Sequence, residues 1–272
     1  MFRERFRLGR ALRNIVSWLG LLVLVSSFVW MELMPKPDAA TATPLVRPPS
    51  NREPFAVVVL DPGHGGQDSG AMCAGVLEKD LTLDIARRVD RLLQAEGLAT
   101  AMTRVGDSYV SLADRAAFAN RVRDCVFVSI HFNEGNKKEQ ISSGVETFYA
   151  AHQATPASLM ISWMPFLQRA ASEFPNVESQ TLAGFVQEAL VARTQAVNRG
   201  TKAEQFFVLA NVNRPAVLVE GGFLSNKEDI SKIANSDYRE QMAAAISEGI
   251  LRYRNVLKER QPALALGVPG TE

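Results

Sequence analysis

Four residues of the sequence carry side chains that together could bind a metal ion and use it in catalysis. His64 stands in DPGHGG, His131 in SIHFN and Glu220 in LVEGG, and each comes after an apolar run. Glu78 follows a glycine-rich stretch, at the start of a helical pattern. Two histidines and one carboxylate are a known ligand set for catalytic zinc that leaves one position for water. A further carboxylate beside such a set could act as a general acid or base.

Each of these residues also has a simpler structural interpretation when it is taken alone. A single histidine is more often structural than a ligand, and Glu78 could serve only to satisfy the dipole of a helix N-terminus. Glu220 is the least ordinary of the four, because a carboxylate that follows an apolar run is costly to bury unless it is paired or bound to a metal. The remaining histidine, His152, stands in a polar stretch and is predicted to be exposed.

The residues around His64 are rich in glycine. Gly63, Gly65, Gly66 and Gly70 surround this histidine, and such a density lets the backbone turn sharply and approach a ligand closely. An ordinary flexible loop is the alternative. A phosphate-binding loop is disfavoured, because the stretch has neither a GxGxxG pattern nor a Lys-Ser/Thr pair.

The elements that must position these residues follow from the hydrophobic pattern. Predicted strands and helices alternate, which is typical of an α/β sheet covered on both faces. In open α/β sheets ligands bind at the carboxyl ends of the strands, where we expect His64, His131 and Glu220 to lie. The predicted strands are 55–61, 98–104, 125–131, 144–150, 205–210 and 216–220, and the predicted helices are 79–96, 111–123 with Ser111 as N-cap, 157–173, 179–198, 226–234 and 237–259.

The N-terminal part of the chain predicts export from the cytoplasm. Residues 15–31 carry no charge and are mostly apolar, and residues 1–13 hold five arginines and one glutamate. This apolar segment is at the lower edge of the length that spans a bilayer, and the positive-inside bias places the following residues outside the cytoplasmic membrane. An uncleaved signal anchor is favoured over a cleaved signal peptide, although the small residues at 40–42 leave cleavage open.

We therefore expect four segments in the chain. Residues 1–34 form a basic tip and a membrane-spanning or signal helix, and residues 35–54 a proline-rich linker. Residues 55–260 form the catalytic domain, and residues 261–272 a loose tail. The domain would lie in the periplasm or cell envelope, held to the cytoplasmic membrane by the N-terminal segment.

Composition excludes some classes of partner and of fold. The 272 residues have a net charge of +1, of which residues 1–13 supply +4, so the remainder carries about −3 (1 − 4). A domain of that sign lacks the basic footprint of a nucleic-acid-binding protein. Two cysteines are too few for a disulfide framework. Cys125 is predicted to be a buried small hydrophobe, and a single bond to Cys73 remains open.

Six motifs link the chain to a known family. They are, in order, VVLDPGHGGQDSGA, GVLEKDLTLDIA, SLADRAAFAN, FVSIHFNE, GVETFY and RPAVLVEGGFLSN. With these motifs, residues 55–258 resemble the zinc-dependent N-acetylmuramoyl-L-alanine amidases, cell-wall hydrolases of amidase type 3. The resemblance implies a single α/β domain around a mixed, mostly parallel sheet of about six strands. It also implies that His64, Glu78 and His131 bind one zinc ion and that Glu220 is the catalytic carboxylate.

The same resemblance implies a reaction and a substrate. We expect cleavage of the peptidoglycan amide between N-acetylmuramic acid and L-alanine by zinc-activated water, with Glu220 moving the proton. Asp61 and Asn133 are candidates to accept hydrogen bonds from the ligand histidines. Phe132 stands where the family often has alanine, and we expect it to narrow the pocket. A zinc peptidase acting within the stem peptide and a non-catalytic peptidoglycan-binding module are the alternatives.

One long connection could regulate the site. Residues 151–180 exceed the length of a simple connection between elements, and they include large apolar residues such as Trp163 and Phe166. Packing of this stretch on the sheet is the plain interpretation. A movable lid over the zinc crevice, released by the wall or by a protein activator that the sequence does not name, is the alternative.

Overall fold

The computed structural model describes residues 54–73, 75–134, 142–153 and 176–260. The predicted membrane or signal helix, nearly all of the linker, the helix predicted at 157–173 and the tail 261–272 lie outside these residues. Among the residues described, no helix is long and apolar enough to cross a membrane. All of them belong to one compact unit.

A six-stranded sheet forms the centre of the described domain, in the order β4-β1-β5-β8-β6-β7. The strands β4, β1, β5 and β8 are mutually parallel, β6 is antiparallel to β8, and β7 is parallel to β6. The predicted mixed, mostly parallel sheet is therefore confirmed. Their bounds are β1 Val57–Pro62, β4 Ala99–Met102, β5 Cys125–Asn133, β6 Val145–Tyr149, β7 Asn198–Ala203 and β8 Ala216–Phe223.

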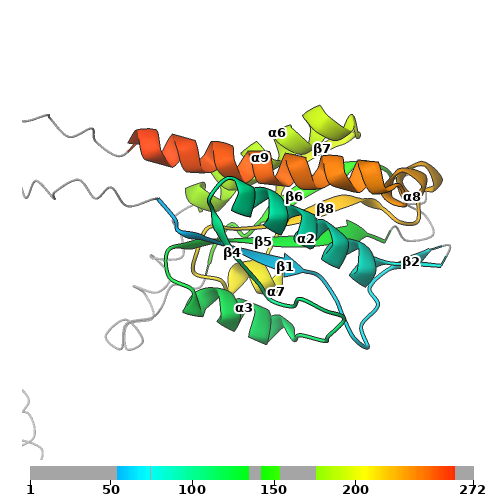
Figure 1. Ribbon diagram of the computed structural model, residues 1–272, viewed down its shortest axis with the longest axis horizontal. Helices are drawn as coiled ribbons and strands as arrows, with labels where there is room; N and C mark the ends of the chain where they lie inside the picture. The colour runs from blue at the N-terminus through cyan, green and yellow to red at the C-terminus, as the bar shows by residue number, and fades with distance from the viewer. Residues whose placement is uncertain (1–53, 74, 135–141, 154–175, 261–272) are drawn as a thin grey trace, which may run out of the picture. The chain divides into compact units, whose positions relative to one another are not determined.

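Helices cover the two faces of this sheet unequally (Figure 1). On one face lie the long helices α2 (Glu78–Ala95), α6 (Val177–Thr194) and α9 (Ser236–Arg260), and a large apolar core fills the space between them and the sheet. The other face carries α3 (Leu112–Arg121) and the one-turn helix α7 (Phe207–Ala210) over a smaller core. Because side chains alternate along a strand, every second residue of each strand points to this thinly covered face. In β5 they are Cys125, Phe127, Ser129 and His131.

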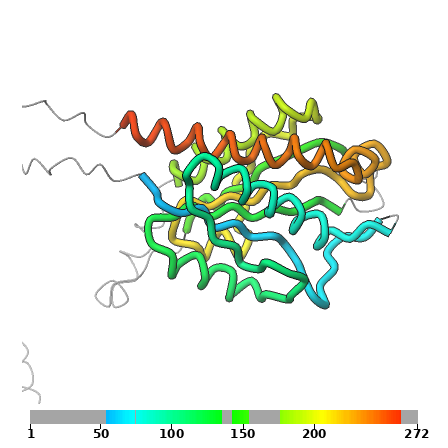
Figure 2. Tube along the Cα trace, viewed as in Figure 1, coloured from blue at the N-terminus to red at the C-terminus, as the bar shows by residue number. Residues whose placement is uncertain are grey.

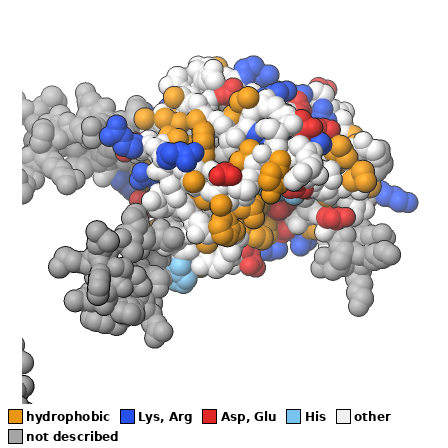
Figure 3. All heavy atoms as spheres, turned by 90° about the horizontal axis from the view of Figure 1, so that it is seen from below, with side chains coloured by type: hydrophobic (Ala, Val, Ile, Leu, Met, Phe, Trp, Pro, Cys, Tyr) orange, Lys and Arg blue, Asp and Glu red, His pale blue; other side chains and the backbone are white. Residues whose placement is uncertain are grey.

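The space-filling view from the side of α3 and α7 shows how this second face meets solvent (Figure 3). Apolar, acidic and basic side chains are scattered over it, and no single sign of charge dominates. At one end of the domain the first described residues run beside the end of α9 (Figure 2), where the rings of Phe55 and Tyr253 stack at 6.1 Å. Because β1 starts at this end, the carboxyl ends of the parallel strands lie at the opposite end.

In the second half of the domain one predicted strand is wrong, and one strand of the structure was not predicted. The apolar run predicted as strand 205–210 contains helix α7, and the edge strand β7 lies earlier, at Asn198–Ala203. A short apolar run does not distinguish a strand from a buried helical turn, and here Val208 and Leu209 are both buried against the smaller core. The strand was missed because NRGTKA has no apolar side chain larger than alanine, as an exposed edge strand allows.

The remaining predictions differ mainly at their ends. Ser111 is the N-cap of α3, since its side chain accepts a hydrogen bond from the amide of Asp114 (3.1 Å), but that helix ends at Arg121 rather than Arg123. Strands β5 and β8 run two and three residues past the predicted ends, so His131 and Glu220 lie inside strands. Helix α8 (Lys227–Ile233) and the two-residue strands β2 (Met72–Cys73) and β3 (Val76–Leu77) complete the described elements.

The two cysteines do not pair. Cys125 is buried, as predicted, and burial raises the pKa of its thiol above the ordinary value. Cys73 is half-buried in β2, and both thiols are free. The disulfide that the sequence left open is absent from this structure.

Candidate metal centre

His64 reaches the site from a loop that only glycine-rich sequence can form. The backbone of His64 is left-handed (φ +59°), a conformation that costs energy in a residue with a side chain. A Cβ atom on Gly63 would lie 2.3 Å from the ring of His131, and one on Gly70 would lie 2.5 Å from the carboxylate of Glu78. The glycines on both sides of His64 therefore let the backbone pass directly against the other site residues.

Two buried arginines hold this loop in place. Arg115 donates to the carbonyl oxygens of Pro62 and His64 (both 2.7 Å) and pairs with the carboxylate of Asp61 (2.7 Å). Arg104 donates to the carbonyl oxygens of Pro62 (3.0 Å) and Gly63 (2.8 Å). These bonds satisfy carbonyl groups of the loop, and they fix the position of His64. Neither arginine was predicted to have a role, because nothing in the sequence marks an arginine just after β4 and another in α3 as neighbours.

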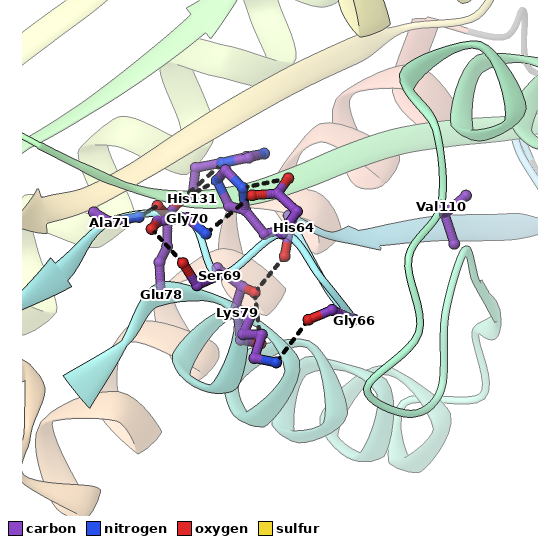
Figure 4. A network of polar contacts seen from close by, with 12 residues as sticks. His64, Gly66, Ser69, Gly70, Ala71, Glu78, Lys79, Val110 and His131 are labelled. Carbon is purple, nitrogen blue, oxygen red and sulfur yellow. Dashed lines mark hydrogen bonds and ion pairs between the residues drawn. The ribbon is translucent and has the colours of Figure 1, made fainter. Parts of the chain in front are cut away.

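Glu78 begins helix α2, and its side chain lies under both histidines (Figure 4). Its Oε2 accepts a hydrogen bond from the amide of Ala71 (2.9 Å), and its Oε1 accepts one from the amide of Phe132 (3.0 Å). The side chain is buried, which opposes ionisation. Hydrogen bonds with His131 and His64 outweigh this effect, so the pKa of Glu78 is far below its usual value. The carboxylate is therefore a fixed negative charge.

The two histidines face this carboxylate from different elements, His64 from the loop after β1 and His131 from β5. Glu78 Oε1 lies 3.1 Å from His64 Nε2 and 3.0 Å from His131 Nδ1. The two rings meet edge to face, with centroids 4.9 Å apart. The other nitrogen of His64, Nδ1, lies 2.9 Å from Asp68 Oδ2. Burial opposes protonation of His64, but the two neighbouring carboxylates outweigh it and raise its pKa.

The three residues fit a tetrahedral metal ion. One ligand atom from each of His64, Glu78 and His131 lies within 4.8 Å of the other two. Zinc bonds of about 2.1 Å at tetrahedral angles separate ligand atoms by about 3.4 Å, so small side-chain adjustments suffice. His64 would offer Nε2, because its Nδ1 is engaged by Asp68. Such an acceptor behind a ligand histidine is the usual arrangement at zinc sites.

Glu220 lies next to this group but has a different environment. In β8 it is in register with His131 of β5 and with Glu146 of β6, so the three side chains share a row on the thinly covered face. Its Oε2 is shielded from solvent and has no hydrogen-bond partner among the described residues. Burial, and then the negative charges of Glu78 and Glu146, raise the pKa of Glu220 well above its usual value.

The acceptors predicted for the histidines are wrong. Asp61 accepts hydrogen bonds from Arg115 (2.7 Å), Thr103 (2.6 Å) and Ser129 (2.7 Å), and Asn133 donates to Glu146 (2.7 Å). The acceptor is Asp68, which the left-handed turn at His64 folds back onto the ring. A carboxylate four residues from a predicted ligand, inside the same glycine-rich loop, was the signal that could have found it.

Two further predictions concern the side chains near the rim. The side chain of Phe132 is buried in the large core, on the face opposite His131, so the expected narrowing of the pocket is wrong. Its amide, which contacts Glu78, is the part that belongs to the site. His152 is exposed, as predicted.

The fold and this group of residues together define a class of protein. The domain is an α/β protein with two histidines and a buried carboxylate converging at the carboxyl ends of parallel strands, and with a second acidic residue, Glu220, beside His131. The chain belongs to the N-acetylmuramoyl-L-alanine amidase family, whose model matches residues 58–252. It is thus a peptidoglycan amidase by family.

Relatives and solved structures agree with this assignment. The chain is 33% identical to the N-acetylmuramoyl-L-alanine amidase LytC of Bacillus subtilis (strain 168) over 196 residues, which is 72% of this chain but only 35% of LytC. An amidase from Clostridium difficile 630 is similar at a TM-score of 0.63 and 33% identity, covering 74% of this chain and 97% of that one. AmiC2 of Nostoc punctiforme is similar at 0.62 and 34%, covering 73% and 97%.

Proposed function

We propose that this domain is a zinc-dependent N-acetylmuramoyl-L-alanine amidase that acts outside the cytoplasm. His64, Glu78 and His131 would hold the ion, and Glu220 would be the catalytic carboxylate. The observation that carries the proposal is the contrast between two acids near His131. Glu78 is ionised between two histidine nitrogens, whereas Oε2 of Glu220 has no hydrogen-bond partner among the described residues. A bound zinc ion supplies acidification of a water molecule and polarisation of the scissile carbonyl.

In this proposal the residues around the metal centre have separate roles. Glu220, whose pKa burial and neighbouring charges raise, takes the proton from the attacking water and delivers it to the leaving amine of L-alanine. The leaving amine requires this proton, because an amide anion is a poor leaving group. Asp68 holds His64 in the tautomer that leaves Nε2 free. Arg104 and Arg115 keep the loop rigid, so that the geometry is set before the substrate arrives.

The cleaved bond can be identified directly. Purified peptidoglycan is digested by the zinc-loaded protein, and the soluble products are analysed by mass spectrometry. Free stem peptides with an unblocked N-terminal L-alanine are expected. Cleavage within the stem peptide would identify a zinc peptidase instead, and an absence of products with retained binding to the wall would identify a binding module.

Export is the second part of the proposal, and the sequence of residues 1–34 supports it. The positive cluster before the apolar segment should hold the N-terminus inside and place the domain in the periplasm or cell envelope. A reporter fused after residue 54 is expected to be active only outside the cytoplasmic membrane. A mature protein that starts near Thr43 would replace the anchor with a cleaved signal peptide, and a reporter active inside would refute export.

A further inference from the structure

A charged cluster lies beside Glu220 on the same face of the sheet, and the mechanism above does not use it. Glu146 of β6 is in register with Glu220. Its carboxylate accepts hydrogen bonds from Asn133 Nδ2 (2.7 Å) and Arg199 Nε (3.1 Å), and it pairs closely with Lys202 Nζ. Burial opposes ionisation of Glu146, but the bonds from Lys202, Asn133 and Arg199 outweigh it and lower its pKa.

The cluster presents positive charge to solvent. It contains two cations, Arg199 and Lys202, and one ionised carboxylate, so a charge of one unit is not neutralised within it. The carboxylate of Glu146 is only 4% exposed, whereas the side chains of Arg199 and Lys202 are 31% and 40% exposed. An approaching molecule therefore meets the cations and not the buried acid.

Arg199 is oriented for a further contact. Its Nε is bound to Glu146, and its guanidinium lies 4.8 Å over the ring of Phe223. Within the described part of the chain its two terminal nitrogens donate no hydrogen bond. A guanidinium held on one edge and one face offers those nitrogens as a fork, which is the geometry that binds a carboxylate with two parallel bonds.

The position of the cluster relative to the site suggests which group it binds. Neighbouring strands are about 4.8 Å apart, so the backbone of β7, two strands from β8, lies about 10 Å from that of Glu220. An extended peptide advances about 3.4 Å per residue, so two to three residues span that distance. Of the two sides of the scissile amide in peptidoglycan, the stem peptide carries free carboxylates, whereas the glycan near the bond carries neutral hydroxyl and acetamido groups.

We propose that Arg199 and Lys202 form a subsite for a carboxylate of the stem peptide, two to three residues beyond the scissile amide. This inference rests on the proposed amidase function and adds a specificity determinant to it. Glu146 acts as a positioning residue, because it fixes both cations on the face that carries His131 and Glu220. The subsite would orient the stem along the row of the sheet, from the metal centre toward the β7 edge.

The test uses two substrates that differ only in charge. The zinc-loaded protein is assayed on a muramyl tripeptide with free carboxylates and on the same compound with every carboxyl group amidated. The free form is expected to have a kcat/KM about tenfold to a hundredfold higher, chiefly through a lower KM, since one charge-assisted contact is gained. Arg199→Gln should bring the ratio of the two kcat/KM values close to one.

A matched control and the opposing outcomes complete the experiment. Arg193→Gln removes an arginine that is 48% exposed and paired with Glu248, on the helix-covered face away from the site, and it should keep the full preference. Arg199→Lys, which keeps the charge but loses the fork, should keep part of it. Equal rates on both substrates in the unchanged protein, or an undiminished preference in Arg199→Gln, would overturn the subsite. Cleavage of neither compound would instead remove the amidase function itself and this inference with it.

Discussion

Glu78 and Glu220 are both neighbours of His131 at the carboxyl end of the sheet, yet their surroundings act on them in opposite ways. Both oxygens of Glu78 accept backbone hydrogen bonds, and one of them also faces two histidine nitrogens. Oε2 of Glu220 is shielded and has no partner among the described residues. The first environment stabilises the ionised form and lowers the pKa of Glu78, and the second favours the neutral form and raises the pKa of Glu220.

Under the proposed function, this difference explains how one end of the sheet would hold both a metal ligand and a proton carrier. A ligand must stay ionised and immobile, which the amides of Ala71 and Phe132 and the arginine-held loop provide. A proton carrier must be able to change its charge, so it cannot be locked by donors. A bound zinc ion would lower the pKa of both acids, but the order of the two is set by the protein.

The largest expected effect comes from replacing one carboxylate oxygen by an amide nitrogen in Glu78 or in Glu220. Glu78→Gln should lose zinc and reduce activity to background, because a neutral amide is a weak zinc ligand. Glu220→Gln should keep zinc and the fold and lose about 10²–10⁴-fold in kcat, because the amide cannot accept and return a proton. Zinc content by elemental analysis and kcat on peptidoglycan fragments separate the two. Zinc loss in Glu220→Gln would make it a ligand and remove the contrast.

The next prediction tests whether the loop around His64 depends on the buried arginines. Arg115→Met should lower the free energy of unfolding by about 3–5 kcal/mol, because it leaves Asp61 charged and buried without its partner. Arg91→Met, at an exposed ion pair with Glu240, is the control and should change stability by less than about 1 kcal/mol. Denaturant unfolding measures both. Similar losses in the two variants would show that the loop is held by other contacts.

A smaller effect is expected from the residue behind His64. Asp68→Asn should weaken zinc binding about 10–100-fold, because the asparagine oxygen is a poorer acceptor for the Nδ1 proton and fixes the ring less well. Competition with a chelator gives the zinc affinity. The same change at the acceptor that the sequence suggested, Asp61, would act through stability and not through zinc affinity, since Asp61 makes no contact with either histidine. Equal zinc affinity in Asp68→Asn and the unchanged protein would refute this role.

The sequence predicted what depends on local pattern. The apolar runs of β1, β5 and β8 and the helical spacing of α2 and α9 identified an α/β sheet, and they placed the four site residues at one edge of it. The motifs then suggested a role for each residue, and the structure brings all four together. What the pattern missed are elements too short or too polar to have a pattern, which are the two-residue strands β2 and β3 and the edge strand β7.

Contacts between residues far apart in the sequence were also missed, and for a different reason. The acceptor for His64 depends on one left-handed backbone conformation, and the arginines that hold the loop come from the segment after β4 and from α3. Glu146 stands in a strand that was recognised, but its partners Arg199 and Lys202 lie on β7, which was not. Because β7 was not predicted, nothing in the sequence was a reason to place Arg199 and Lys202 beside Glu146.

The smallest expected effect concerns the pH dependence of stability in the zinc-free protein. It tests the raised pKa of Glu220. The pKa of Glu220 is raised in the folded state, so between its unfolded and folded pKa values the folded protein binds more protons than the unfolded chain. Stability then falls as pH rises through that window. Below the unfolded pKa, near 4.3 for a glutamate, both states are protonated and the cost is absent.

Glu220→Gln removes this cost because glutamine stays neutral at every pH. In the zinc-free proteins the variant should therefore melt at a higher temperature than the unchanged chain at pH 8, and the difference in Tm should shrink toward zero at pH 4. Glu78→Gln should do the opposite at pH 8 and melt lower, since it removes a carboxylate whose ionised form is stabilised. Thermal unfolding with a chelator at both pH values measures the two differences. Equal differences at pH 4 and pH 8 for Glu220→Gln would mean that Glu220 keeps its ordinary pKa, and that the two acids differ only in metal contact.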